Sequence, residues 1–215
     1  MSKGVLTVVS GFSGAGKGTV MKRLIQKYDD YALSISVTTR KPREGERDGI
    51  EYFFKTKEEV ETMIENDEFL EYARYVDNYY GTPRFYVEEM LAKGKNVILE
   101  IEIQGAMQIK AKNPEAVLVF VTPPSFEELR NRLVGRGTET ADVIESRLRR
   151  ASEEAEGMPS YDYILVNDTI SNTLSRFAQI IHSNRYSRNC MKEFLDSYID
   201  GEVKPHVQSY KEALL

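Results

Sequence analysis

The chain has 215 residues, of which 41% are hydrophobic and 29% charged, and its formal net charge is −5 at pH 7. This length suits one α/β core with room for a small inserted region. The acidic balance argues against a general nucleic-acid binder, which needs a dominant basic face. A single cysteine, Cys190, excludes an internal disulfide, and no stretch approaches the roughly 20 apolar residues of a membrane span. We therefore expect a cytoplasmic protein with no nucleic-acid and no membrane partner.

The predicted elements alternate between strands and helices. A short apolar run at 5–10 predicts a buried strand, a glycine-rich turn follows, and 17–28 predicts a helix with one apolar face. Further strands are predicted at 96–101, 116–122 and 163–166. Further helices are predicted at 84–93 (with Thr82 as its N-cap and Pro83 as its first residue), 104–112, 125–135, 140–156 and 170–186. This alternation indicates a parallel sheet covered on both faces.

The stretch from about 33 to 81 breaks this rhythm. It contains alternating residues at 34–39, two aromatic clusters and a polar helical pattern near 57–66. These features predict a small mixed β region inserted between the first strand–helix unit and the rest of the core. The polar segment 187–215 forms a tail, in which only 188–199 has a helical pattern.

A G-x-x-x-x-G-K pattern lies at 11–17, directly after a predicted strand and directly before a predicted helix. This is the context of a phosphate-binding loop, in which glycines let successive N–H groups point inward and Lys17 meets the β- and γ-phosphates. The residues expected to contact the triphosphate are Gly11, Phe12, Ser13, Gly14, Ala15, Gly16, Lys17, Gly18 and Thr19. Such a loop indicates that the protein binds a nucleoside triphosphate but does not identify the reaction.

The position after Lys17, which usually carries a hydroxyl that helps to hold Mg²⁺, is Gly18. Thr19, a water molecule or a carboxylate is left to replace that hydroxyl. Glu100 is a candidate for holding waters of Mg²⁺, because it ends a predicted strand and ligands of parallel sheets bind at the carboxyl ends of strands. A solvated charge at the strand end is the alternative. His182 and His206 have no metal-ligand spacing with any partner.

Two arginines, Arg40 and Arg43, stand three residues apart around a proline turn. Two guanidinium groups near one point suit a phosphate monoester, although a solvated arginine-rich turn has the same pattern.

The phosphate loop and five further motifs follow one another in order and together resemble the guanylate kinase family over roughly 4–186. The five are S-x-T-T-R-x-P-R-x-G at 36–45, E-Y-A at 71–73, N-Y-Y-G-T at 78–82, I-L-E-I-x-x-Q-G at 98–105 and R-G-T-E-T at 136–140. The resemblance implies an α/β phosphate-loop fold that phosphorylates GMP, or deoxy-GMP, with ATP and Mg²⁺. It also implies a core at 1–32, 83–129 and 148–186, a GMP-binding region at 33–82, a helical lid at 130–147 and a tail at 187–215.

The resemblance also assigns roles around GMP. Ser36, Arg40 and Arg43 match the groups at the GMP phosphate, with hydroxyl donors from Tyr52 and Tyr80.

At the base, Glu71 matches the carboxylate that pairs with N1–H and the exocyclic amine of guanine, and Thr82 matches the hydroxyl at O6. The base chemistry supports this independently, because guanine offers two adjacent donors to a carboxylate whereas adenine presents an acceptor at N1. Glu102 stands where the family has an aspartate that also reaches the guanine edge, and its extra methylene changes that contact or leaves it to a water.

The stretch 130–150 carries six arginines and no lysine. By resemblance, Arg132, Arg136 and Arg147 neutralise the transferring phosphoryl group together with Lys17 and Arg40, and Arg136 also lies near the adenine. The resemblance places Asn167 at the ATP base. We expect the remaining arginines to form surface ion pairs: Arg130, Arg149 and Arg150 with Glu127, Glu153 and Glu154.

Two alternatives stay open. One is a nucleoside monophosphate kinase that prefers AMP or a pyrimidine nucleotide. The other is a non-catalytic guanylate-kinase-like binding module, for which the tail at 187–215 is the best support. The oligomeric state is open between monomer and homodimer.

Overall fold

The computed structural model describes residues 4–75, 77–135 and 140–207. Its centre is a five-stranded sheet in the order β2-β7-β1-β8-β9, with every neighbouring pair parallel. These strands are β1 (Leu6–Gly11), β2 (Tyr31–Leu33), β7 (Asn96–Glu100), β8 (Val117–Thr122) and β9 (Tyr163–Val166). The predicted parallel α/β sheet is confirmed. The additional strand β2 has only three residues, too few to produce a recognisable alternation.

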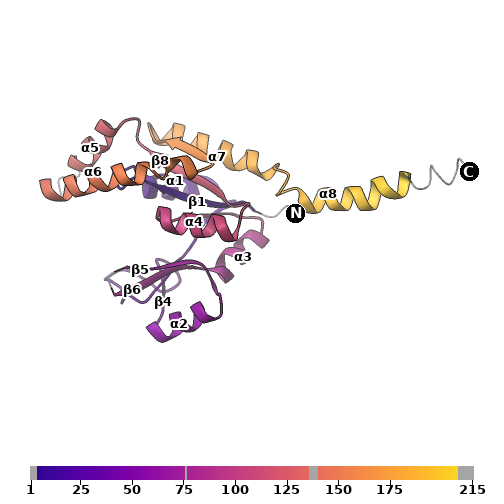
Figure 1. The fold of residues 1–215 in the computed structure, drawn as a ribbon, viewed down its shortest axis with the longest axis horizontal. Coiled ribbons are helices and arrows are strands. Elements are labelled where there is room, and N and C mark those ends of the chain that lie inside the picture. The colour runs from indigo at the N-terminus through magenta and orange to yellow at the C-terminus, as the bar shows by residue number, and fades with distance from the viewer. Residues whose placement is uncertain (1–3, 76, 136–139, 208–215) are drawn as a thin grey trace, which may run out of the picture.

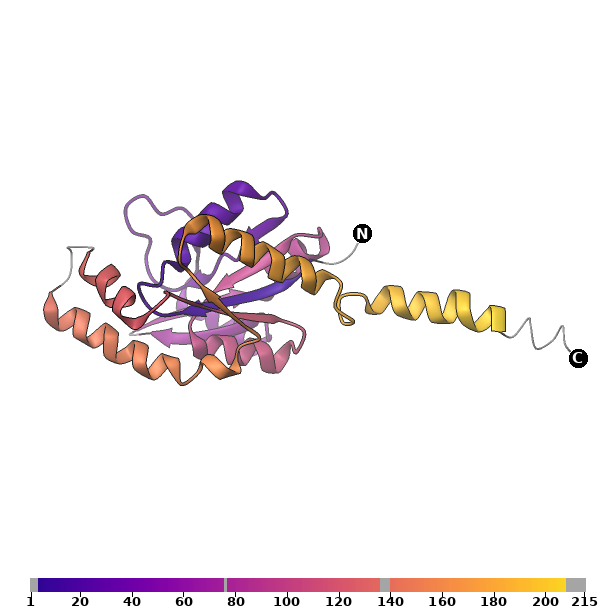
Figure 2. The ribbon, with the colours of Figure 1, turned by 90° about the horizontal axis from the view of Figure 1, so that it is seen from above.

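Helices cover both faces of this sheet, with α1 packed against α7 and α4 against β1 (Figures 1 and 2). The helices of this part are α1 (Lys17–Lys27), α3 (Arg84–Ala92), α4 (Ile103–Lys112), α5 (Phe126–Val134), α6 (Ala141–Ala155), the short 3₁₀ helix η1 (Met158–Ser160) and α7 (Ile170–Arg185). Because both faces are covered, the central strands are mostly apolar, and every residue of β8 from Val117 to Val121 is buried.

A second, mixed sheet lies beside the core and has the order β4-β3-β6-β5 (Figure 1). Its strands are β3 (Val37–Thr38), β4 (Phe53–Phe54), β5 (Phe69–Tyr75) and β6 (Asn78–Pro83), and α2 (Lys57–Glu65) packs on it. Helix α2 starts at a capping box, in which Thr56 and Glu59 each satisfy the backbone N–H of the other. The small core of this region is formed by Val37, Val60 and Phe69.

Helix α3 starts at Arg84 as predicted, but its expected N-cap is wrong by one position. Pro83 is both the last residue of β6 and the N-cap of α3, so Thr82 belongs to the strand and caps no helix. The pairing of β6 with β5 sets Thr82 opposite Glu71, which directs its hydroxyl to that carboxylate.

The tail is helical for longer than its sequence pattern indicates. Helix α8 (Lys192–Ser197) continues through the π-helical turn η2 (Tyr198–Val203), and helical backbone extends to residue 207. Gly201 and Pro205 interrupt the pattern because both residues are poor helix formers. This segment projects from the body of the molecule (Figures 1 and 2). Within the described ranges, none of the helices is long and apolar enough to cross a membrane.

Candidate active site

The phosphate loop connects β1 to α1 through backbone that only glycine adopts easily. Gly16, the N-cap of α1, has a φ of 88°, and Gly11 has a φ of 145°. A Cβ at Gly11 would lie 2.0 Å from the carbonyl oxygen of Val121 on the neighbouring strand. The loop is therefore held close to the sheet, and the N-terminus of α1 faces the space above the strand ends.

Lys17 is folded back onto the loop. Its Nζ donates hydrogen bonds to the carbonyl oxygens of Gly11 at 2.6 Å and Phe12 at 3.2 Å. Burial lowers the pKa of Lys17, while the nearby carboxylates of Glu100 and Glu102 act in the opposite direction. Both partners of the ammonium are uncharged carbonyl oxygens. A bound phosphate, which carries a full negative charge, could take their place.

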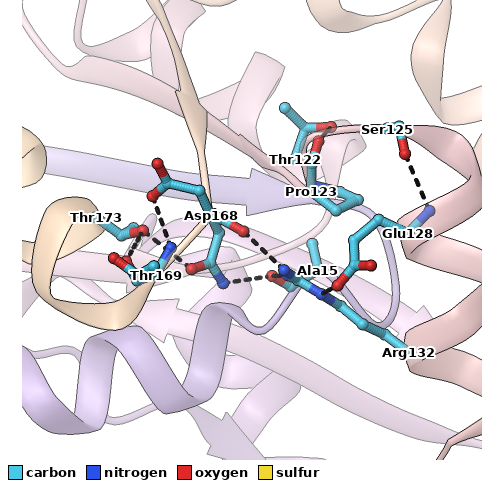
Figure 3. A network of polar contacts seen from close by, with 10 residues as sticks. Ala15, Thr122, Pro123, Ser125, Glu128, Arg132, Asp168, Thr169 and Thr173 are labelled. Atoms are coloured by element: carbon cyan, nitrogen blue, oxygen red, sulfur yellow. Dashed lines mark hydrogen bonds and ion pairs between the residues drawn. The ribbon is translucent and has the colours of Figure 1, made fainter.

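Arg132 ties α5 to the phosphate loop and to the end of β9. It donates to the Glu128 carboxylate at 2.8 Å, to the backbone carbonyl of Asn167 at 2.9 Å and to that of Ala15 at 3.4 Å (Figure 3). Arg147 of α6 donates to the Ser13 hydroxyl at 3.2 Å. Both arginines therefore reach the loop, as their predicted role requires.

Arg136 lies outside the described residues. Its predicted contact with the transferring group and the adenine therefore stays a prediction.

Asn167 is 4% exposed and lies against the loop. Its side-chain amide donates to the Ala15 carbonyl at 2.7 Å and accepts from the Thr173 hydroxyl at 3.0 Å. The Thr173 hydroxyl has one proton, and it shares this proton with the Thr169 carbonyl, 2.7 Å away (Figure 3). The side chain supports the phosphate loop in this structure, and its expected contact with the ATP base stays a prediction.

The expected base-recognition pair is buried. Glu71 is 7% exposed and Thr82 is 0% exposed, and the Thr82 hydroxyl donates to the Glu71 carboxylate at 2.6 Å. Burial raises the pKa of Glu71. Gly105 leaves room for this carboxylate, because a Cβ there would lie 3.0 Å from Oε2 of Glu71. A carboxylate held in this way can recognise a group that offers two adjacent donors.

Arg40, expected at the acceptor phosphate, has a partner that the sequence did not predict, Glu46. Its guanidinium forms two hydrogen bonds of 2.9 Å to the carboxylate of Glu46, and it lies 5.3 Å from the ring centroid of Tyr52. The backbone N–H of Arg43 also donates to Glu46, at 2.7 Å. The rings of Tyr52 and Tyr80 meet edge to face with centroids 6.2 Å apart. Arg40 and Glu46 are six residues apart across a turn, a spacing that matches no regular secondary structure and so does not predict their contact.

Two adjoining cavities connect these groups. One, of about 450 Å³, has Lys17 at the phosphate loop, and the other, of about 770 Å³, has Glu71 and Tyr80. Seven residues line both cavities: Ser36, Tyr52, Glu100, Ile101, Glu102, Ile103 and Glu154. The phosphate-loop cavity therefore leads directly into the cavity lined by Glu71.

Glu102 is the N-cap of α4 and forms an ion pair of 2.8 Å with Arg150 of α6. Arg150 also pairs with Glu154 at 2.9 Å, as expected, but Arg149 pairs with Glu145 instead of Glu153. Arg149 and Glu145 are four residues apart, the spacing at which side chains meet on a helix. The link from Arg150 to Glu102 joins residues 48 positions apart, so sequence spacing does not indicate it.

Side-chain oxygen atoms near the phosphate loop are the kind of ligand that Mg²⁺ prefers. Both carboxylate oxygens of Glu100 lie 3.8 Å from the position that a Cβ of Gly18 would occupy, and Thr19 follows on the same turn. Burial raises the pKa of Glu100, and Lys17 opposes this. In the described part of the chain no group of three His, Cys, Asp or Glu residues could hold a metal. Mg²⁺ commonly keeps waters and phosphate ligands and takes only one or two protein ligands, which these donors can supply.

Comparisons with known proteins agree with this geometry. The guanylate kinase family model matches residues 3–184. A guanylate kinase of Bacillus cereus (strain ZK / E33L) is 52% identical over 200 residues, covering 93% of this chain and 98% of its own length. One from Clostridioides difficile (strain 630) is 54% identical over 190 residues, covering 87% and 93%. The crystal structure of a guanylate kinase from Anaplasma phagocytophilum superposes with a TM-score of 0.68 at 33% identity, covering 91% of this chain and 95% of the other. On this evidence the chain belongs to the guanylate kinase family.

Proposed function

We propose that this chain transfers the γ-phosphoryl group of ATP to the phosphate of GMP, giving ADP and GDP. The observation that carries the proposal is the continuity of the two cavities. The cavity at the phosphate loop and Lys17 opens into the cavity lined by Glu71, whose carboxylate accepts a hydrogen bond from the buried Thr82. Two nucleotides bound there would meet with their phosphates facing each other, as direct in-line transfer requires.

GMP recognition divides between its two ends. At the base, Glu71 would accept the two adjacent donors of guanine, and the Thr82 hydroxyl, which donates to Glu71 in the ligand-free structure, would turn its proton to O6. At the phosphate, Arg40 and Arg43 supply the positive charge, and Ser36, Tyr52 and Tyr80 supply hydroxyl donors. Because Glu46 already orients Arg40, little rotational freedom is lost when the phosphate binds.

Neutralisation of charge on the transferring group is the main catalytic task. We assign it to Lys17, Arg132 and Arg147 from the loop and lid, together with Arg40 and with Arg136. No residue needs to act as a general base, since the attacking oxygen belongs to an already anionic phosphate. Closure of the segment 130–147 over the loop would exclude water and so limit hydrolysis of ATP.

Thr19 and Glu100 would hold Mg²⁺ or its waters, and the ion would supply positive charge that offsets the charge of the ATP phosphates. We further propose that deoxy-GMP also serves as an acceptor and that Asn167 contacts the ATP base. We also predict a cytoplasmic location, a monomeric or homodimeric state, and a division of the chain into core, GMP-binding region and lid.

The test is ADP formation from ATP and Mg²⁺ with GMP, AMP, CMP or UMP offered in parallel. We expect turnover with GMP and little with the other three acceptors. Equal turnover with AMP or a pyrimidine nucleotide would contradict the acceptor pocket described above. Nucleotide binding without any turnover would instead favour the non-catalytic binding module.

A further inference from the structure

Helix α6 directs two arginines toward the site from one face. Arg147 and Arg150 are three residues apart, a spacing that places side chains on the same side of a helix. Arg147 reaches Ser13 in the phosphate loop, and Arg150 reaches Glu102 at the start of α4. The intervening Arg149 pairs along the helix with Glu145. Helix α6 thus contacts the ATP side and the GMP side of the site through different arginines.

The contacts of Arg150 are directional. Its Nη2 donates to Oε2 of Glu102 at 2.8 Å, and its Nε donates to Oε1 of Glu154 at 2.9 Å. The other oxygen of Glu154 is buried and has no hydrogen-bond partner among the described residues. One guanidinium therefore bridges two carboxylates that line the base cavity.

The base cavity needs such a cation. Five carboxylates line it, namely Glu71, Glu100, Glu102, Glu153 and Glu154, and Arg74 and Arg150 are the two cations among its described lining residues. Without compensation this charge would repel an incoming nucleotide anion, and the flexible Glu102 side chain would sample several rotamers.

We propose that Arg150 is a GMP-positioning residue, which acts by holding the carboxylate of Glu102 in place at the base cavity. The inference rests on the proposed function and on the assignment of Glu102 to the guanine edge. Glu102 reaches farther than an aspartate would, and the bridge from α6 restricts where its longer side chain can place the carboxylate. Arg150 does not itself touch the reacting atoms.

The experiment compares R150Q and R150K with R149Q, a matched control that removes an arginine one position away. For each variant we would measure kcat and the KM values for GMP and ATP, the melting temperature, and the Kd for GMP by calorimetry. We expect R150Q to raise the KM and Kd for GMP about fivefold, the upper range for a partly exposed ion pair. The KM for ATP and the melting temperature should stay near wild type. R150K should recover part of the loss, and R149Q should match wild type.

The E102Q and E102Q/R150Q variants test whether the effect passes through Glu102. With Glu102 neutralised, the R150Q change should add little to the KM for GMP. The inference is overturned if R150Q behaves like R149Q, if it raises both KM values equally, or if its full effect persists in the E102Q background. Failure of the proposed function looks different: the wild type would then not phosphorylate GMP, and calorimetry would still compare R150Q with R149Q.

Discussion

The side-chain amide of Asn167 donates a hydrogen bond of 2.7 Å to the carbonyl oxygen of Ala15, across 152 positions of sequence. It joins the end of the last strand to the centre of the phosphate loop. The Thr173 hydroxyl holds the same amide from the other side at 3.0 Å. The conformation of the phosphate loop thus depends on a segment that lies 152 residues later in the chain.

Replacing Asn167 by alanine should weaken the loop. The change leaves the buried Ala15 carbonyl with only a longer contact from Arg132, a loss of about 1–3 kcal/mol in the free energy of unfolding. We expect the KM for ATP to rise several-fold while that for GMP changes little. Urea unfolding and steady-state kinetics measure the two effects, and an unchanged KM for ATP would contradict the supporting role.

Lys17→Met should abolish most turnover without unfolding the chain. The side chain gives up only two hydrogen bonds to loop carbonyls, whereas the transition state loses a positive charge. Removal of one such group costs about 100- to 1000-fold in kcat. The exposed Lys57→Met on α2 is the control, and retention of more than a tenth of the wild-type kcat in Lys17→Met would refute the assignment.

Glu71→Gln should reduce kcat/KM for GMP about 10- to 100-fold, because the amide replaces one acceptor of guanine's two donors with a donor. AMP should not become a good substrate, because this single substitution does not create the other contacts that adenine would need. Parallel kinetics with GMP and AMP test this. A variant that used GMP as well as the wild type would show that another group reads the base.

The same substitution should alter how stability depends on pH. Burial raises the pKa of Glu71, so its contribution to stability is full below the ordinary carboxyl pKa and is lost as pH rises through the raised value. Glutamine has no charge to bury, so the ligand-free variant should melt at a higher temperature than wild type at pH 7. At pH 4 the difference should shrink. Equal shifts at both pH values would argue against a buried charge.

Gly105→Ala should displace the base-recognition carboxylate. The added Cβ would lie 3.0 Å from Oε2 of Glu71 and 3.2 Å from Cδ1 of Ile101. We expect a rise of about tenfold in the KM for GMP, with less effect on ATP. Gly201→Ala is the matched control, because nothing lies within 4 Å of a Cβ there. Similar kinetics for the two variants would contradict this crowding.

Glu100→Gln should raise the Mg²⁺ concentration needed for half-maximal turnover several-fold, since a carboxylate is a better ligand or water acceptor than an amide. The expected lowering of kcat at saturating Mg²⁺ is smaller. A Mg²⁺ titration at fixed ATP and GMP measures both. An unchanged titration curve would leave the ion to Thr19 and the substrate phosphates.

The sequence alone was sufficient to predict the parallel α/β sheet and the phosphate loop. A buried strand, a glycine-rich turn and an amphipathic helix are local patterns, and the loop at Gly11–Lys17 depends on backbone freedom that residue type dictates. Glu71 and Thr82 could be singled out because their motifs resemble the guanylate kinase family, and for Glu71 the chemistry of a carboxylate also suits guanine. The paired strands β5 and β6 bring the two residues together.

Tertiary structure alone decided which side chains hold the others in place. Arg40 binds Glu46 across a turn, and the Asn167 amide supports the Ala15 carbonyl. The side chain of Arg150 on α6 reaches Glu102 at the start of α4. None of these pairs has a helical or strand spacing, so periodicity carries no information about them. They form because the packing of distant elements around one sheet brings their polar ends to the same edge, where buried groups must find partners.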